Sequence, residues 1–518
     1  MSPSRPHILL IILDTLRRDR LSAYGHNRET SPELDAFAGQ ATLFERAVAP
    51  AQWTIPSHSS MFTGLYPSTH QVTQSSSSLS GSYPALAEIL RGEGYHTVAF
   101  CNNPLVGVLN NGLQRGFEHF YNYASAAPFR PKEAQRSQLH RTALRFFRRN
   151  FARPLGNQFA HSDFLFRMSL NPVFVPLWTR LINYKGHTAN SIDDFIEYWQ
   201  KQRTAAADTP VFAFLNLMGT HLPYTPPQDY VDGVAPGLRH DKHAYSFMRR
   251  FNSDAARWAS PPDPALADWE QQALVDFYDA EILHQDYHLG RLLRMLKQSG
   301  ALDHTMVIIA ADHGEGHGDH DFFGHSFVVY QELVHVPLVI YDKERFPAGM
   351  RVPTNVSTRR IFHTVLEAAE VQPPLDSADP NANVTGLSLR AATQNSQPVE
   401  DDLAYSEAFP PLTFLNVVQH QNPALIERLR LNLTRRSVYA GAHKLVTVGN
   451  QVEGLFNVSK DPAEVRNIAA NHPSEVAMLR RKLDTFVAQA ENQRAEAAEF
   501  AEVDAGVVDH LRALGYIE

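Results

Sequence analysis

Four short apolar runs constrain the fold of this 518-residue chain more than any other feature of its sequence. They lie at residues 8–13, 97–101, 211–217 and 306–311, and each is rich in β-branched or aromatic residues. Such runs are typical of strands that are buried in a parallel sheet. Segments with helical periodicity lie between them, among them residues 84–93 and 274–296. Strands that alternate with helices predict an α/β fold with a doubly wound, mostly parallel sheet.

The chain changes character towards its C-terminus. Residues 373–396 are rich in Pro, Asp, Asn and Ser, which predicts a long connection. After it we expect two strands and a helix, at 437–440, 444–448 and 474–490. The sequence therefore predicts a catalytic domain over residues 1–399 and a smaller C-terminal α+β subdomain over residues 400–518.

A segment at about 130–184 does not fit this pattern, because basic and aromatic residues are interleaved along it. One interpretation is an interfacial helix or a lid over an anionic substrate, with peripheral contact to a membrane or lipid. The other is a helical insertion that packs Phe and Leu inward and leaves Arg in solvent. Both interpretations stay open.

Composition excludes several classes of protein. Lys and Arg total 47 against 55 Asp and Glu, a net charge of −8, so we expect no nucleic-acid partner. The one cysteine, Cys101, excludes a disulfide framework and a cysteine-rich metal cluster. The N-terminal apolar run is too short for a signal peptide, and no stretch approaches the roughly 20 apolar residues of a membrane span. We therefore expect a cytoplasmic protein.

Polar residues follow each of the four predicted strands. Asp14 follows the first, Asn102 and Asn103 the second, His221 the third, and the pair Asp312 and His313 the last. Ligands of open parallel sheets bind beyond the carboxyl ends of the strands. A single Asp at such a place is a common helix cap, but four polar strand ends together predict a binding or catalytic site.

Asp312 and His313 open the densest ionisable cluster of the chain, Asp-His-Gly-Glu-Gly-His-Gly-Asp-His, which is followed by His325. Carboxylate oxygens with an imidazole nitrogen suit a divalent cation such as Mn²⁺, Mg²⁺, Ca²⁺ or Zn²⁺. We therefore expect Asp312 and His313 to bind a metal ion.

Thr54 precedes a predicted short helix, in which Pro56 suits the first turn and Gly64 the C-terminal stop. Backbone N–H groups at a helix N-terminus favour an anion. A hydroxyl there, beside a bound cation, can lose its proton and attack a phosphoryl centre. The alternative is that Thr54 only caps the helix.

These residues resemble the sulfatase branch of the alkaline phosphatase superfamily. Its motifs occur in order through most of the chain: Leu-Asp-Thr-Leu-Arg at 13–17, Leu-Ser-Ala-Tyr-Gly at 21–25, Ser-Pro-Glu-Leu-Asp at 31–35, Thr-Gly-Leu-Tyr-Pro at 63–67, Thr-His-Leu-Pro-Tyr at 220–224, Ala-Asp-His-Gly-Glu at 311–315 and the closing segment at 450–467. The resemblance implies the alkaline phosphatase and sulfatase-like fold.

The chain departs from this family at the nucleophile. Sulfatases carry Cys or Ser at the start of a Cys/Ser-x-Pro-Ser-Arg motif and oxidise it to formylglycine, whereas this chain has Thr54-Ile-Pro-Ser-His58. Threonine is a secondary alcohol, so the same oxidation cannot yield an aldehyde. Threonine here resembles instead the phosphodiesterases and the phosphoglycerol and phosphoethanolamine transferases of the superfamily, which form a phosphothreonine. The members of the superfamily that hold two metal ions require a second set of ligands in an Asp-x-x-x-His motif, and the equivalent stretch 217–221 has Leu in place of the Asp. Thr15 stands where sulfatases have a second Asp. The resemblance therefore implies one cation, foremost Mn²⁺ or Ca²⁺, held by Asp14, Thr54, Asp312 and His313.

The predicted function is metal-dependent hydrolysis of small-molecule phosphate esters, either phosphodiesters or phosphonate monoesters, by attack of Thr54. We expect His221 to protonate the leaving oxygen and His325 to contact non-bridging oxygens. Substrate-binding residues are expected among the remaining polar candidates, which are His58, His70, Asn102 and Asn103. One alternative is a sulfatase that lacks formylglycine, another is a phosphoglycerol or phosphoethanolamine type of transferase, and a third is a metal-binding pseudoenzyme that docks through 130–184. The sequence leaves the oligomeric state open.

Overall fold

A computed structural model describes residues 5–124, 129–131, 185–205, 209–253, 261–262, 265–375, 379–394, 400, 402–495 and 499–500. The basic and aromatic segment predicted at 130–184 lies outside the described residues, except for its first two positions. None of the helices within these ranges is long and apolar enough to cross a membrane.

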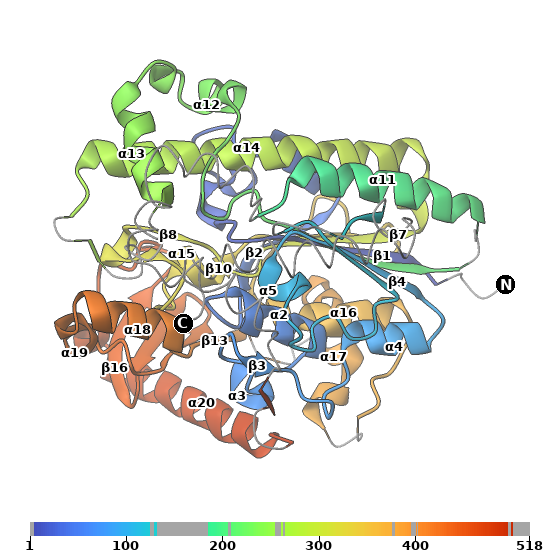
Figure 1. The fold of residues 1–518 in the computed structure, drawn as a ribbon. Coiled ribbons are helices and arrows are strands. Elements are labelled where there is room, and N and C mark those ends of the chain that lie inside the picture. The colour runs from blue at the N-terminus through green and yellow to red at the C-terminus, as the bar shows by residue number, and fades with distance from the viewer. Residues whose placement is uncertain are drawn as a thin grey trace, which may run out of the picture.

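The four predicted strands form the centre of a mostly parallel sheet (Figure 1). They are β1 (His7–Leu13), β4 (His96–Cys101), β6 (Val211–Leu217) and β7 (Thr305–Ala310), in the spatial order β7-β1-β6-β4. All three pairings among them are parallel. Residues 8–12 of β1 have no exposed surface, which explains why this strand is apolar on both faces. The predicted α/β fold is confirmed.

Further strands widen the sheet on both sides. β5 (His119–Asn122) adds a parallel strand beyond β4, and β11 (Leu338–Tyr341) pairs antiparallel with β7. Beyond β11 lies β2 (Thr42–Val48), which also pairs with β10 (His335–Val336) and β12 (Arg351–Ser357). The sheet therefore has nine strands in the part of the chain that the structure describes.

Helices cover both faces of this sheet (Figure 1). On one face lie α14 (Asp268–Gln298) and α11 (Thr188–Ala205), and on the other lie α2 (Thr54–Thr63), α4 (Leu86–Gly92) and α16 (Ile361–Ala368). The start of α14 is fixed by Glu270, whose carboxylate accepts the backbone N–H of Ala267 at 3.1 Å. The helices predicted at 84–93 and 274–296 are confirmed as α4 and α14.

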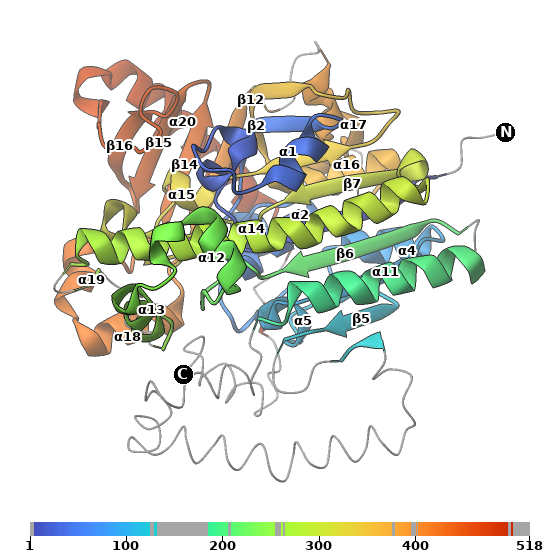
Figure 2. The same ribbon diagram turned by 90° about the horizontal axis from the view of Figure 1, so that it is seen from above.

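A smaller antiparallel sheet follows in the C-terminal part, beside the main sheet in Figure 2. It comprises β13 (Leu403–Ala408), β14 (Arg435–Ala440), β15 (His443–Val448) and β16 (Gln451–Asn457), and α20 (Pro473–Asn492) packs against it. The predicted strands and helix of this region are confirmed. The prediction of a long connection at 373–396 is wrong in part, because α17 (Val384–Leu387) forms there with Asn383 as its N-cap.

Short elements complete the described chain. They are α1 (Pro32–Ala38), α3 (Pro67–His70), α5 (Pro104–Gly107), α12 (Gln228–Val234), α13 (Lys242–Ser253), α15 (Gln331–Val334), α18 (Leu412–Gln421), α19 (Ala424–Leu429), β3 (Ser77–Ser78), β8 (Gly316–His317), β9 (Phe323–Gly324) and β17 (Glu499–Phe500).

Candidate active site

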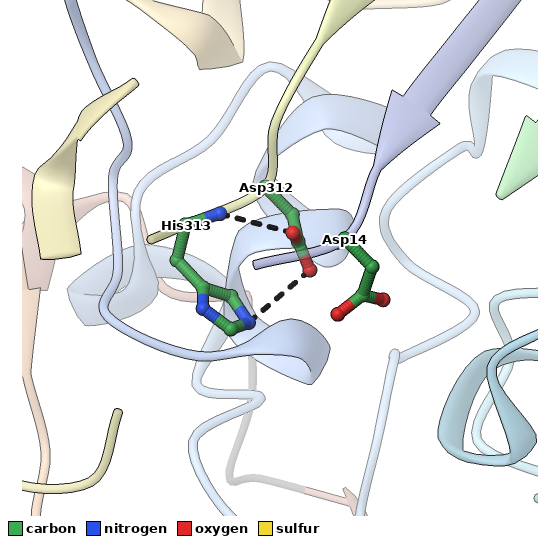
Figure 3. Close-up of side chains that lie close together, drawn as sticks. All are labelled: Asp14, Asp312 and His313. Atoms are coloured by element: carbon green, nitrogen blue, oxygen red, sulfur yellow. Dashed lines mark hydrogen bonds and ion pairs between the residues drawn. The ribbon is translucent and has the colours of Figure 1, made fainter. Parts of the chain in front are cut away.

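Two adjacent parallel strands bring the predicted metal ligands together. Asp14 directly follows β1, and Asp312 and His313 follow the neighbouring strand β7. One ligand atom from each of these three residues lies within 4.8 Å of the others (Figure 3). All three side chains are fully buried. The carboxyl ends of β1 and β7 therefore form a compact group of two carboxylates and one imidazole.

The hydrogen bonds that each of the two carboxylates accepts end on one of its two oxygens. Asp14 Oδ2 accepts from the side-chain amides of Asn103 at 2.7 Å and Asn216 at 3.0 Å. Asp312 Oδ1 accepts from the backbone N–H groups of Thr15 at 3.2 Å and His313 at 3.0 Å. The other oxygens, Asp14 Oδ1 and Asp312 Oδ2, are buried without a hydrogen-bond partner among the described residues.

This arrangement fits a divalent cation. Burial, and then the charge of Asp14, raise the pKa of Asp312 well above its ordinary value. Two neighbouring buried carboxylates are costly unless a positive charge lies between them. His313 Nδ1 lies 2.8 Å from the carbonyl oxygen of Gly314, which fixes the ring and leaves Nε2 as the ligand atom. Asp14, Asp312 and His313 would hold the ion.

Thr15 contributes through its backbone, which the sequence did not reveal. Its φ is +59°, an unusual conformation for a β-branched residue. In this conformation its N–H donates to Asp312, while its carbonyl accepts from the hydroxyl of Tyr278 at 2.7 Å. The strained residue thus fixes one of the two carboxylates.

Thr54 lies at the same place, on the first turn of α2. The helix begins at Thr54, whereas the sequence predicted that Thr54 lies just before it. Pro56 falls in the first turn as predicted, where a proline removes no helical hydrogen bond. Thr54 Oγ1 lies 3.3 Å from His313 Nε2 and accepts from Asn103 Nδ2 at 3.4 Å. The residue at the N-cap position is Trp53. The hydroxyl of Thr54 therefore faces the candidate metal group and does not cap the helix.

His58 lies one helical turn after Thr54 and is fully buried. Its Nδ1 lies 2.9 Å from the carbonyl oxygen of Thr54 and 3.5 Å from Asp312 Oδ2. Its Nε2 lies 3.3 Å from the amide of Asn216. Burial lowers the pKa of His58, against the opposing charge of Asp14. Sequence reasoning missed Asn216, although an amide within the apolar strand β6 was a usable signal.

Two further histidines adjoin the group. The ring centre of His325 lies 4.5 Å from that of His313 and 5.3 Å from that of His221. Burial lowers the pKa of His221, with the charge of Asp14 opposing it. Burial also acts to lower the pKa of His325, but Glu315 outweighs it and the net shift is upward. The structure therefore brings His221 and His325 to the candidate site with their pKa values shifted in opposite directions.

Asn102 and His70 direct their polar atoms elsewhere. The amide of Asn102 donates to the carbonyl oxygen of Lys185 at 3.1 Å, and its oxygen accepts from the hydroxyl of Ser191. His70 Nε2 lies 3.0 Å from Ser60 Oγ, and burial lowers the pKa of His70 to about 3. In the described chain, no hydrogen bond joins either side chain to the two carboxylates.

Lys185 supports the turn that carries His221. Its ammonium group donates to the carbonyl oxygens of Gly219 at 2.8 Å and His221 at 3.1 Å, and to Glu281 Oε1 at 2.8 Å. Sequence reasoning missed this residue, because its partners are 34 to 96 positions away in the chain.

A family model described as Sulfatase matches residues 6–371, which include all of the residues above. Among curated proteins, an arylsulfatase of Clostridium perfringens is 24% identical over 447 residues, covering 78% of this chain and 81% of that protein.

Solved structures show the same fold. The phosphonate monoester hydrolase of Agrobacterium radiobacter superposes with a TM-score of 0.64 at 22% identity, covering 94% of this chain and 96% of that one. A protein in complex with its substrate D-glucosamine-2-N,6-O-disulfate superposes with a TM-score of 0.64 at 16% identity, covering 95% of this chain and 100% of that one.

Proposed function

The chain belongs to the sulfatase family, and from that premise we propose that it hydrolyses a small-molecule sulfate or phosphate ester by attack of Thr54. The observation that carries this proposal is the position of the Thr54 hydroxyl. It lies on the first turn of a helix, 3.3 Å from His313 Nε2, beside two carboxylate oxygens that accept no hydrogen bond in the described chain.

The residues of the site have separate tasks in this reaction. Thr54 Oγ1 loses its proton to solvent and attacks the sulfur or phosphorus atom. The bond to the alcohol breaks, which leaves the sulfuryl or phosphoryl group esterified to Thr54. Asn103 donates to Oγ1 and orients it. A cation held by Asp14, Asp312 and His313 would withdraw charge from the attacking hydroxyl and the ester oxygens.

His221 is the proposed acid that protonates the leaving alcohol. Its Nδ1 proton is held 2.6 Å from the carbonyl oxygen of Leu222, and burial lowers its pKa, so Nε2 takes the transferred proton from solvent before it gives it to the alcohol. His325, whose ring centre lies 5.3 Å from that of His221, contacts a non-bridging oxygen. Water then cleaves the ester on Thr54, which restores the hydroxyl. If an acceptor alcohol replaces water, the same residues catalyse a transfer.

Two classes of ester have separate support. The arylsulfatase relative, and the structural neighbour that binds a disulfated glucosamine, support a sulfate ester, which is the class favoured by the comparisons as a whole. Thr54 supports a phosphodiester or a phosphonate monoester, because a secondary alcohol cannot become the aldehyde on which formylglycine sulfatases depend. A structural neighbour that is a phosphonate monoester hydrolase agrees with this second class.

Turnover of four matched aryl esters tests the proposal: sulfate, phosphate monoester, phosphodiester and phosphonate monoester. The protein is depleted of metal and resupplied with Mn²⁺, Ca²⁺ or Zn²⁺. We expect cation-dependent turnover of at least one ester, and a loss of at least about 10³-fold in Thr54→Ala. Thr54→Ser is the matched control, since it keeps a hydroxyl. Full turnover by Thr54→Ala would show that the proposed nucleophile is wrong. If none of the four esters is turned over while cation binding is intact, a transferase or a pseudoenzyme is favoured.

A further inference from the structure

Glu315 is a buried carboxylate beside the site with no task in the reaction described above. It is 2% exposed, and its Oε1 lies 2.7 Å from Nδ1 of His325. A carboxylate can only accept hydrogen bonds, so the proton of this contact sits on Nδ1 of the imidazole. Nε2 is then the ring nitrogen that is left for a ligand. Within the described chain no hydrogen bond engages it.

The backbone holds the two residues opposite each other. β8 and β9 form a short antiparallel pair in which Gly316 lies opposite Gly324, so Glu315 and His325 flank the same cross-strand position. The pair is close because residue 316 has no side chain. A Cβ there would lie 2.8 Å from the carbonyl oxygen of Phe322 and 3.0 Å from that of Gly324. The register of this hairpin therefore determines the contact.

A second layer of hydrogen bonds fixes Glu315 itself. Its other oxygen, Oε2, accepts from the hydroxyl of Tyr224 at 3.3 Å. That hydroxyl also lies 3.2 Å from Nε2 of His317. Both carboxylate oxygens are thus occupied by fixed partners, so Glu315 cannot rotate without losing one of them.

We propose that Glu315 is a positioning residue, which orients the imidazole of His325 so that Nε2 faces the oxyanion of the ester. This inference rests on the proposed function for the role of His325 and deepens it. The arrangement follows the general logic in which a carboxylate fixes the tautomer and direction of a histidine that contacts the substrate. Glu315 itself touches neither the ester nor the cation.

A double-mutant cycle on the cation-loaded protein tests the proposal, with inorganic sulfate and inorganic phosphate as probes. Glu315→Gln keeps the size of the side chain but no longer requires the proton on Nδ1. We expect it to weaken oxyanion binding by about tenfold, the usual effect of losing a charge-assisted hydrogen bond. In a His325→Asn background the same substitution should have almost no further effect. Tyr224→Phe, which removes the second layer only, should have a smaller effect than Glu315→Gln.

Cation affinity separates a positioning role from a structural one. We expect Glu315→Gln to leave the binding of Mn²⁺ unchanged, because its carboxylate is not part of the metal group. Additive effects of the two substitutions, or a loss of cation binding in step with oxyanion binding, would overturn the proposal. These measurements require no turnover, so they are independent of whether Thr54 is the nucleophile. Thr54→Ala tests that point alone.

Discussion

Replacement of Asp14 by Asn should stabilise the cation-free protein, which is the opposite of what the loss of a buried polar contact usually does. An amide oxygen at position 14 can still accept from Asn103 and Asn216, as Oδ2 does now. The amide nitrogen takes the place of Oδ1, which has no partner among the described residues. The substitution thus keeps both hydrogen bonds and removes one of two neighbouring buried charges.

The magnitude follows from the burial of the pair. Asp14 and Asp312 are both 0% exposed, and an uncompensated buried ion costs several kcal/mol after relaxation. Because the remaining carboxylate keeps its own hydrogen bonds, we expect the cation-free Asp14→Asn variant to gain about 2 kcal/mol in free energy of unfolding. The wild-type protein should gain about 2.7 kcal/mol from a cation at 100 times its dissociation constant. The variant should gain almost nothing.

Chemical unfolding in EDTA and in excess Mn²⁺ or Ca²⁺ measures both differences. Asp279→Asn is the matched control, because this carboxylate is equally buried but is paired with Arg20 and Arg28. The control should be less stable than the wild type with and without cation. If Asp14→Asn behaves like the control, and its stabilisation by cations is unchanged, the reasoning that places a cation between the carboxylates is wrong.

Two further predictions concern the surroundings of the site. Lys185→Met should lower turnover more than oxyanion affinity, because it releases the turn that carries His221, and a comparison of kcat with KM checks this. Asp279→Asn should cost about 3 kcal/mol at pH 7. Burial acts to raise the pKa of Asp279, but His26 and Arg20 outweigh it and lower that pKa below its ordinary value of 3.8. The carboxylate therefore stabilises the fold above about pH 4 and loses this effect as the pH falls further, so the difference between variant and wild type should shrink in acid.

The parts of the fold that follow from local sequence were predictable. The strands β1, β4, β6 and β7 are continuous apolar runs in the sequence. The ends of β1 and β7 correctly predicted where Asp14, Asp312 and His313 lie in the fold. β2 was not predicted, because charged residues at 45 and 46 interrupt its apolar pattern. These two positions are partly exposed in the structure, so the strand tolerates them. Its pairing with β11 and β12 comes from tertiary contacts that no local pattern contains.

The supporting residues of the site were harder to find than the ligands. Thr15 acts through an unusual φ, and φ cannot be read from a residue type. Lys185 donates to Glu281 across 96 positions, and Glu315 contacts His325 through the register of the short β8–β9 hairpin. A strand end predicts which side chains converge on a site. It does not predict which more distant groups orient them.

The charge of the site bears on the ester it accepts. Asp14 and Asp312 carry two negative charges, which one divalent cation balances. Burial lowers the pKa of His58, and burial together with His325 lowers that of His313, so both rings are neutral at pH 7. Sulfate monoesters, phosphodiesters and phosphonate monoesters carry one negative charge, whereas a phosphate monoester carries close to two. His325 and Glu315 add no net charge: burial opposes both charges, but their mutual attraction raises the pKa of His325 and lowers that of Glu315. In a site of balanced charge, the second charge must be desolvated without an additional cation to compensate it. The charge count thus disfavours phosphate monoesters, while the chemistry of Thr54 is what can distinguish phosphorus from sulfur.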